Sequence, residues 1–277
     1  MFKEQFKRLI ILLGAVILFG AAVRSSFSQG EKNNITDSNA ADFTWVKLTD
    51  GIEFTTYHFI NDANVIKQEI YLVRIDPRKI KTNVAIASDL NLPSRIDIKS
   101  ISRYSNALVG INANFFDVEG KPLGLIIRDG KKLNKLHGGG KTLSGIFYIK
   151  NGLPGIVFRD MPLPANVTLA IQSGPRLVAN GEKSKLVPSA HASRRSGVAV
   201  TYDKQIIIYA TLLRFPGTTL EQVQDMLLLK ELNIKDALNL DGGSSSQLYI
   251  DKSITTGGEE IFITGGDVVP VGLVFGK

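Results

Sequence analysis

Short runs of β-branched and aromatic residues recur along most of this 277-residue chain, and this pattern constrains the fold more than any other feature. Each run has the length of a β-strand and is bounded by residues that favour turns. The 26 glycines have no regular period, so they indicate tight turns and not a collagen-like repeat. The expected strands are residues 51–60, 66–75, 82–87, 107–111, 125–128, 145–149, 169–171, 197–202 and 205–211.

Two of the turns predict hairpins, and helices are fewer than strands. The dipeptides at 129–130 (Asp-Gly) and 151–152 (Asn-Gly) favour the positive φ angles of two-residue hairpin turns. A serine can cap a helix over 94–106, and a Thr-x-x-Gln capping box starts a second helix over 219–233. We therefore predict an α+β fold, a single domain with a mixed β-sheet and a few covering helices.

The N-terminus has the plan of an export signal. A basic start precedes the fifteen uncharged residues 9–23, and a short polar stretch follows them. We predict that residues 1–28 form a signal peptide or a signal anchor, that 29–41 form a polar linker, and that the folded domain occupies 42–277. The protein is expected to be exported, as a periplasmic, cell-surface or secreted protein or as one anchored in the membrane through residues 9–23.

Net charge and cysteine content exclude several classes of function. The formal charge is +7, but residues 1–28 contribute +3 of it, and the remaining lysines and arginines are scattered. A nucleic-acid-binding protein concentrates basic residues in one patch or along one helix, so we expect no nucleic-acid partner. The chain has no cysteine, which excludes disulfides, thiolate catalysis and Cys-ligated metal sites. The oligomeric state stays open.

Two glycine-rich segments resemble known motifs but fail the spacing of those motifs. Residues 137–142, HGGGKT, end like a P-loop, yet Lys135 stands where the first glycine is needed and a strand pattern follows. Such a loop can still border a substrate cleft. Residues 241–246, DGGSSS, lack the closing glycine of a serine-hydrolase elbow, so a nucleophilic serine is not expected there.

Four segments place polar residues where an apolar strand ends or begins. Asparagine suits sugar hydroxyls because its side chain both donates and accepts hydrogen bonds. Arginine matches phosphate oxygens, and a Gly-Gly-Ser-Ser loop can form a nest of backbone amides for an anion. The segments therefore predict a site for an anionic sugar derivative. They are residues 110–117, 172–177 with 180–181, 193–197 and 238–245.

In this order, the four segments resemble motifs of the phosphodiester glycosidase family. Residues 112–116 resemble its Asn-Gly-Gly-Phe-Phe pattern, 172–175 its Gln-x-Gly-Pro pattern and 195–199 its Arg-Thr-Ala-Ile-Gly pattern. The run 220–246, which ends in NLDGGSSS, is the most specific match, and 269–273 resemble the family's last strand. The resemblance covers roughly residues 70–276. It implies an enzyme that hydrolyses sugar phosphodiesters.

The resemblance and the residue chemistry together assign roles. Asp241 is the preferred catalytic carboxylate, Asp117 is the second choice, and Arg195 is the phosphate contact. The substrate-binding candidates are Asn112, Asn114, Gln172, Arg176, Arg194, Asn239, Gly242, Gly243, Ser244 and Ser245. His191 is a weaker candidate. This chemistry requires no cofactor, although Asp117 and Asp241 could share a divalent cation such as Ca²⁺ or Mg²⁺, because carboxylate oxygens suit both ions.

A sugar 1-phosphodiester would release a phosphate monoester, whose second pKa is about 6, and such a leaving group needs little proton donation. Catalysis would then depend on cations that hold the phosphate and on one carboxylate that acts as base or nucleophile. The expected sugar is N-acetylglucosamine-like, in envelope or exopolysaccharide metabolism. Two alternatives stay open. One is a non-catalytic module that binds glycan or polymer phosphate during surface polysaccharide assembly, and the other is a phosphodiesterase that cleaves the P–O bond.

Overall fold

The computed structural model describes residues 43–277, with the exception of 61–65, 188, 190 and 213–216. The predicted signal segment, the linker and the first residue of the predicted domain lie outside the described residues. Within the described part, the strands form three sheets. In the same part of the chain, no helix is both long enough and apolar enough to span a bilayer.

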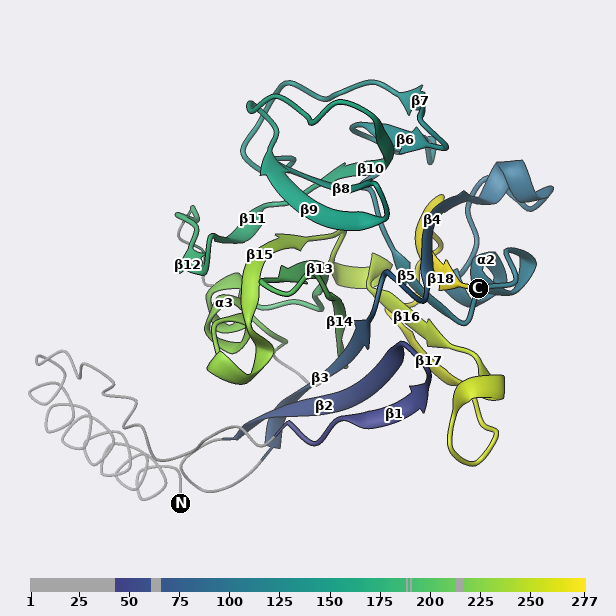
Figure 1. Cartoon of the computed structure of the whole chain (residues 1–277). Coiled ribbons are helices and arrows are strands. Elements are labelled where there is room, and N and C mark those ends of the chain that lie inside the picture. Colours follow the sequence, from purple (N-terminus) through teal and green to yellow (C-terminus); the bar gives the residue numbers. More distant parts are fainter. Residues whose placement is uncertain (1–42, 61–65, 188, 190, 213–216) are drawn as a thin grey trace, which may run out of the picture. The chain divides into compact units, whose positions relative to one another are not determined.

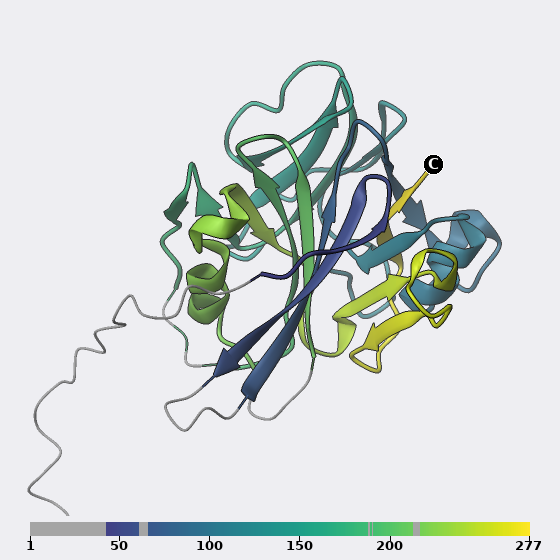
Figure 2. The ribbon, with the colours of Figure 1, turned by 60° about the horizontal axis from the view of Figure 1, so that its bottom comes forward.

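The largest sheet has eight strands and carries much of the candidate site (Figure 1). Figure 2 shows its long strands β2 and β3 side by side, as their antiparallel pairing requires. In spatial order the strands are β1 (Val46–Thr49), β2 (Ile52–Ile60), β3 (Ile66–Ile75), β14 (Ile206–Leu212), β13 (Ser196–Thr201), β15 (Ile234–Asn239), β11 (Arg176–Ala179) and β12 (Glu182–Lys183).

Two five-stranded sheets complete the domain, one at the top of Figure 1 and one at its right. The upper sheet has the order β7 (Lys131–Asn134), β6 (Ile126–Arg128), β10 (Val167–Ser173), β8 (Gly145–Lys150) and β9 (Leu153–Phe158). The other has the order β17 (Ile261–Thr264), β16 (Gln247–Ile250), β5 (Val109–Asn112), β18 (Val271–Gly276) and β4 (Lys81–Ile86).

The main hydrophobic core lies between the sheets, because one buried cluster joins side chains of all three, such as Ile111, Phe147 and Leu238. Successive side chains of a strand point to opposite faces. Strand β14 therefore gives Ile206 and Ile208 to this cluster, while its alternate side chains, among them Ile207, enter a second cluster.

The helices cover outer faces of two sheets. Helix α3 (Leu220–Leu227) buries its apolar stripe, which includes Val223 and Met226, in the second cluster of the large sheet. Helix α2 (Ile98–Tyr104) packs on the C-terminal sheet through Ile98 and Ile101. Single 3₁₀ turns lie at Ala87–Leu90, Lys230–Leu232, Gly243–Ser245 and Lys252–Ile254.

Most of the predicted elements are confirmed. Each of the nine expected strands overlaps a strand of the structure, and both hairpins turn at the expected dipeptides, with positive φ at Asp129, Gly130, Asn151 and Gly152. The strand-rich α+β class is confirmed in outline. The expected mixed sheet is wrong, because every strand pairing in the described part of the chain is antiparallel and the strands divide among three sheets.

The helix boundaries need two corrections. The first helix is capped by Asp97, whose carboxylate accepts a hydrogen bond from the Ser100 amide at 2.8 Å, and not by the serine three residues earlier. The second helix starts at the predicted Thr219 capping box but ends at Leu227. A 3₁₀ turn then leads to Asn233 in the left-handed conformation, which terminates the segment at the predicted residue.

Replacing Leu238 by alanine should test how strongly the core between the sheets stabilises the domain. Leu238 is fully buried in the main cluster, so Leu238→Ala is expected to lower the free energy of unfolding by about 2–5 kcal/mol. Val118 is 97% exposed, and Val118→Ala should change that free energy by less than about 0.5 kcal/mol. Urea denaturation followed by circular dichroism measures both, and equal effects would contradict this account of the core.

Candidate active site

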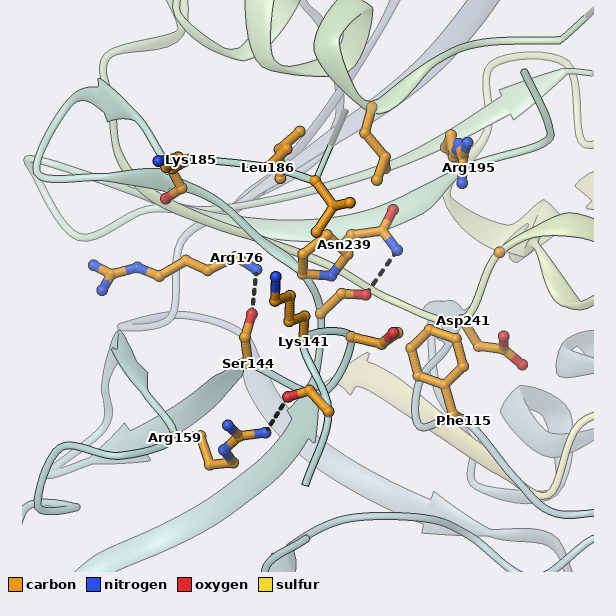
Figure 3. Close-up of a pocket in the computed structure, with 18 of the residues that line it drawn as sticks. Phe115, Lys141, Ser144, Arg159, Arg176, Lys185, Leu186, Arg195, Asn239 and Asp241 are labelled. Carbon is orange, nitrogen blue, oxygen red and sulfur yellow. Dashed lines mark hydrogen bonds between the residues drawn. The ribbon is translucent and has the colours of Figure 1, made fainter. Parts of the chain in front are cut away.

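The ends of strands from the three sheets surround one large pocket of about 1060 Å³ (Figure 3). Its lining includes Arg176 and Asn239 from the neighbouring strands β11 and β15, Arg195 just before β13, and Asp241 just after β15. These strand ends meet because β15 pairs with β11 on one side and with β13 on the other. All four segments predicted from the sequence reach the pocket, three of them through these residues and the segment 110–117 through Phe115.

The backbone of Asp241 is held by three hydrogen bonds from two sheets. Its amide donates to the carbonyl of Ala113 at 3.2 Å, and its carbonyl accepts from Asn112 Nδ2 at 2.6 Å and from Ser196 Oγ at 2.9 Å. Ala113 follows β5, and Ser196 begins β13. The carboxylate is thus carried by backbone that the large sheet and the C-terminal sheet fix together.

The environment of Asp241 raises the pKa of its carboxyl group. Its pKa is raised from the ordinary value to about 6, chiefly by desolvation and also by the charge of Asp267. Hydrogen bonds from the Ser245 hydroxyl and the Gly242 amide favour the charged form and oppose part of this rise. A carboxyl group with this pKa exchanges protons near neutral pH, which suits general acid–base chemistry.

Hydrogen bonds hold Arg195 in a fixed position beside the loop that follows Asp241. Its Nε donates to the Thr218 carbonyl at 3.0 Å, its Nη2 to the His191 carbonyl at 2.7 Å, and its backbone amide to Thr211 Oγ1 at 2.7 Å. A β-carbon built on Gly242 would lie 3.9 Å from Arg195 Nη1. Burial lowers the pKa of this arginine, but a guanidinium remains a cation in proteins.

The loop after Asp241 is not the anion nest that the sequence predicts. It forms a 3₁₀ turn, in which the Gly243 amide donates to the Arg194 carbonyl at 2.9 Å and the Ser245 amide to the Gly242 carbonyl at 3.2 Å. These two amides are occupied by protein acceptors. The side chain of Ser244 is directed to Asp267, with 3.4 Å between Oγ and Oδ2. Gly242 and Gly243 still line the pocket, while Ser244 and Ser245 do not.

Asn112, Asn114 and Gln172 are buried, and their side chains form hydrogen bonds with the backbone. Asn112 also accepts from the Gln247 amide at 2.9 Å, and Asn114 donates to the Leu123 carbonyl at 3.0 Å. None of the three lines the pocket. The expectation that they contact substrate is therefore replaced by a structural role, because their amide groups position loops.

Three further candidates have structural partners. Arg176 lines the pocket, but its guanidinium pairs with buried Asp236 at 2.5 Å and stacks over the Phe158 ring at 4.4 Å. Arg194 does not line the pocket; its side chain bonds the Gly265 carbonyl and so ties two loops together. Asn239 does line it, and its Nδ2 donates to the Gly174 carbonyl at 3.1 Å. His191 is a pocket residue as predicted.

Asp117 lies outside the pocket, which corrects its place as second catalytic carboxylate. Its Oδ1 accepts from the amides of Glu119 and Lys121, both at 2.9 Å, and so closes a turn. The carboxylate whose charge acts on Asp241 is Asp267, which the motifs did not single out. Asp117 does not line the pocket that Asp241 lines, and the sharing of a divalent cation by these two carboxylates stays a prediction. No group of three or more acidic or histidine side chains suited to a metal occurs among the residues that the structure describes.

The pocket also contains residues that sequence reasoning did not assign to the site. They include the basic residues Lys141, Arg159 and Lys185 and the aromatic residue Phe158. In all, five basic and two acidic side chains line the pocket, which favours an anionic ligand. The signal available in the sequence was the glycine-rich loop that contains Lys141, since such a loop can border a substrate cleft.

Comparison with known proteins agrees with this geometry. The sequence model of the phosphodiester glycosidase family matches residues 105–274, a range that includes Arg195, Asn239 and Asp241. The chain belongs to the phosphodiester glycosidase family. The resemblance noted in the motifs is thereby confirmed, and family membership indicates a hydrolase that acts on phosphodiester-linked sugars. No curated protein sequence matches this family member.

Two solved structures share the fold of this phosphodiester glycosidase. One is the catalytic domain of zebrafish N-acetylglucosamine-1-phosphodiester alpha-N-acetylglucosaminidase, auto-inhibited by its pro-peptide, with a TM-score of 0.62 and 19% identity over 86% of this chain and 89% of that one. The other is a hypothetical protein from Synechocystis, with a TM-score of 0.56 and 18% identity over 86% of this chain. The matched part spans only 64% of the Synechocystis chain. Identities this low establish the fold alone.

Replacing Asp241 by asparagine should stabilise the domain in a pH-dependent way. The folded carboxyl has a pKa of about 6 and the unfolded one about 3.9, so the folded state binds more protons between these values. The wild-type free energy of unfolding should therefore fall as the pH rises from about 4 to about 6. Asp241→Asn removes this penalty, and we expect it to be more stable at pH 7 by up to about 3 kcal/mol.

Thermal and urea unfolding from pH 4 to pH 8 measure this difference. The advantage of Asp241→Asn should shrink toward zero near pH 4. Asp160→Asn serves as a matched control, because its carboxylate lines the same pocket but its side chain is 82% exposed. If Asp241→Asn were destabilised by the same amount at every pH, the raised pKa of Asp241 would be wrong.

Proposed function

We propose that this protein is an exported hydrolase that removes an N-acetylglucosamine-like sugar from a sugar 1-phosphodiester, in envelope or exopolysaccharide metabolism. The observation that carries the proposal is the combination of one partly buried carboxyl with a pKa of about 6, Asp241, and the neighbouring cation Arg195 in a basic pocket. Family membership supports the reaction class. The name of the zebrafish enzyme supports the choice of sugar for a protein of this fold.

The proposed reaction uses the two side chains differently. Above a pH of about 6, Asp241 is ionised and can take a proton from water that attacks the anomeric carbon, or can attack that carbon itself. The bond between the anomeric carbon and the phosphate oxygen breaks, and its electron pair leaves with the phosphate monoester. Arg195 holds the charge of the departing phosphate, which needs little protonation because its second pKa is about 6.

The proposed location rests on the N-terminal sequence. Residues 1–28 have the basic start and apolar core of a signal peptide or signal anchor. On this proposal the substrate is a phosphorylated sugar or glycan outside the cytoplasm, and contact with the membrane occurs only through residues 9–23 if the segment is retained.

Substitution of either side chain should abolish most of the activity without unfolding the protein. We expect Asp241→Asn to lower kcat/KM for a sugar 1-phosphodiester by about 100-fold or more, because the base is lost. Arg195→Ala should lower it by about 100- to 1000-fold, because the charge of the leaving phosphate loses its partner. Release of free sugar measures activity, and circular dichroism confirms folding.

Asp117→Asn is the matched control for these variants, since Asp117 closes a turn outside the pocket. It should retain activity within about threefold of wild type. Full activity in Asp241→Asn would overturn the assignment of the carboxylate. Binding of the phosphodiester without turnover, across a panel of sugars and with or without added Mg²⁺ or Ca²⁺, would favour the non-catalytic binding module.

Hydrolysis in water enriched in oxygen-18 should identify the bond that breaks. Attack at the anomeric carbon places the label on the released sugar, whereas attack at phosphorus places it on the phosphate. We expect the label on the sugar, since Asp241 acts at the anomeric carbon in the proposed reaction. Mass spectrometry of both products measures this, and label on the phosphate would establish a phosphodiesterase instead.

A further inference from the structure

The pocket has a second basic end, which the proposed reaction does not use. Figure 3 shows Arg195 and Asp241 on one side of the pocket, and Lys185, Arg176 and Arg159 on the other, with Lys141 between them. When the reacting part of a substrate lies at Asp241, the opposite end of the pocket can therefore hold another part of the same molecule.

Two of these cations have no protein partner within the described ranges. The side chains of Lys141 and Lys185 are exposed, and neither takes part in an ion pair or a hydrogen bond with the residues that the structure describes. In contrast, Arg176 pairs with Asp236 and Arg159 with Asp160. Only the two lysines are thus available to pair with a charge on the ligand.

The loop that carries Lys141 is held in place on both sides of it. Arg159 Nη1 donates to the carbonyls of Gly139 and Gly140, both at 2.9 Å, and to that of Leu143 at 3.2 Å. Gln172 bonds both the amide and the carbonyl of His137 at 2.8 Å. A glycine-rich loop is costly to order, so this anchoring gives Lys141 a defined position at the pocket wall.

The same end of the pocket has room and an apolar surface for a larger group. The volume of about 1060 Å³ is at the upper limit of pockets that hold drug-sized ligands, about 300–1000 Å³. Phe158 lines this end and is 42% exposed, although Arg176 covers one part of its ring. A single sugar phosphate would leave much of this space empty.

We propose that Lys141 and Lys185 form a second anion subsite, which binds a negatively charged group on the alcohol side of the phosphodiester. The substrate class is then a sugar 1-phosphodiester whose leaving group carries a further phosphate, as in a chain of units joined by phosphodiesters. This inference rests on the proposed function. Arg159 acts as a positioning residue, because its guanidinium donates to the backbone of the loop that carries Lys141.

Two substrates that differ only in the leaving group test the proposal. Both carry N-acetylglucosamine 1-phosphate, esterified in one to glycerol and in the other to glycerol phosphate. The wild-type protein should hydrolyse the glycerol phosphate substrate with the higher kcat/KM. In Lys141→Gln/Lys185→Gln the ratio of the two kcat/KM values should fall by about tenfold or more, since two charged contacts are lost.

A matched double variant controls for the loss of positive charge. Lys132 lies on β7 and Lys183 on β12, and neither lines the pocket, so Lys132→Gln/Lys183→Gln should leave the ratio as in wild type. An equal fall of the ratio in both double variants, or a wild-type ratio of one or less, would overturn the second subsite.

Binding measurements separate this inference from the proposed function. If the wild-type protein hydrolyses neither substrate, the proposed function fails, and calorimetry with glycerol phosphate and glycerol 1,3-bisphosphate then decides the subsite. Tighter binding of the bisphosphate that is lost in Lys141→Gln/Lys185→Gln supports it. Equal affinities for the two compounds overturn it.

Discussion

The hydrogen bonds to the backbone of Asp241 are the interaction on which the rest of the site depends. The carbonyl of this residue accepts from Asn112 and Ser196, and its amide donates to Ala113, so two sheets are joined at the backbone of one residue. A buried peptide group that lost these partners would incur the cost of an unsatisfied hydrogen bond. The same bonds that join the sheets therefore hold the acidic side chain at the pocket wall.

The position of Asp241 has an energetic consequence. Burial raises the pKa of the carboxyl to about 6, so the ionised form is unfavourable in the folded state. Carboxyls with a perturbed pKa are concentrated at functional sites, where a side chain must exchange a proton, and this role explains why the folded protein keeps an ionised group in an unfavourable environment. None of the basic residues that line the pocket, the neighbouring Arg195 included, forms an ion pair with Asp241 among the residues described. The carboxyl therefore keeps its raised pKa while the pocket as a whole remains positive.

The fold could be predicted in outline from local pattern. Alternation along the strands, the turn dipeptides at 129–130 and 151–152 and the Thr219 capping box are properties of neighbouring residues, and the structure has all of them. The division into three antiparallel sheets could not be predicted, because pairing such as that of β5 with β16 joins segments about 140 residues apart. The motif residues could be predicted as well, because each motif, like each strand, is a run of neighbouring residues in the chain.

The sequence by itself determined the strand-rich class, the family and the prominence of Arg195, Asn239 and Asp241. The tertiary structure alone decided what each polar side chain does. It buried Asn112, Asn114 and Gln172 in backbone networks, placed Asp117 in a turn, and brought Asp267 near Asp241 and Lys141 and Lys185 to the pocket. The physical reason is that hydrogen-bond partners and desolvation come from segments far apart in the chain, whereas strand and turn preferences come from neighbouring residues.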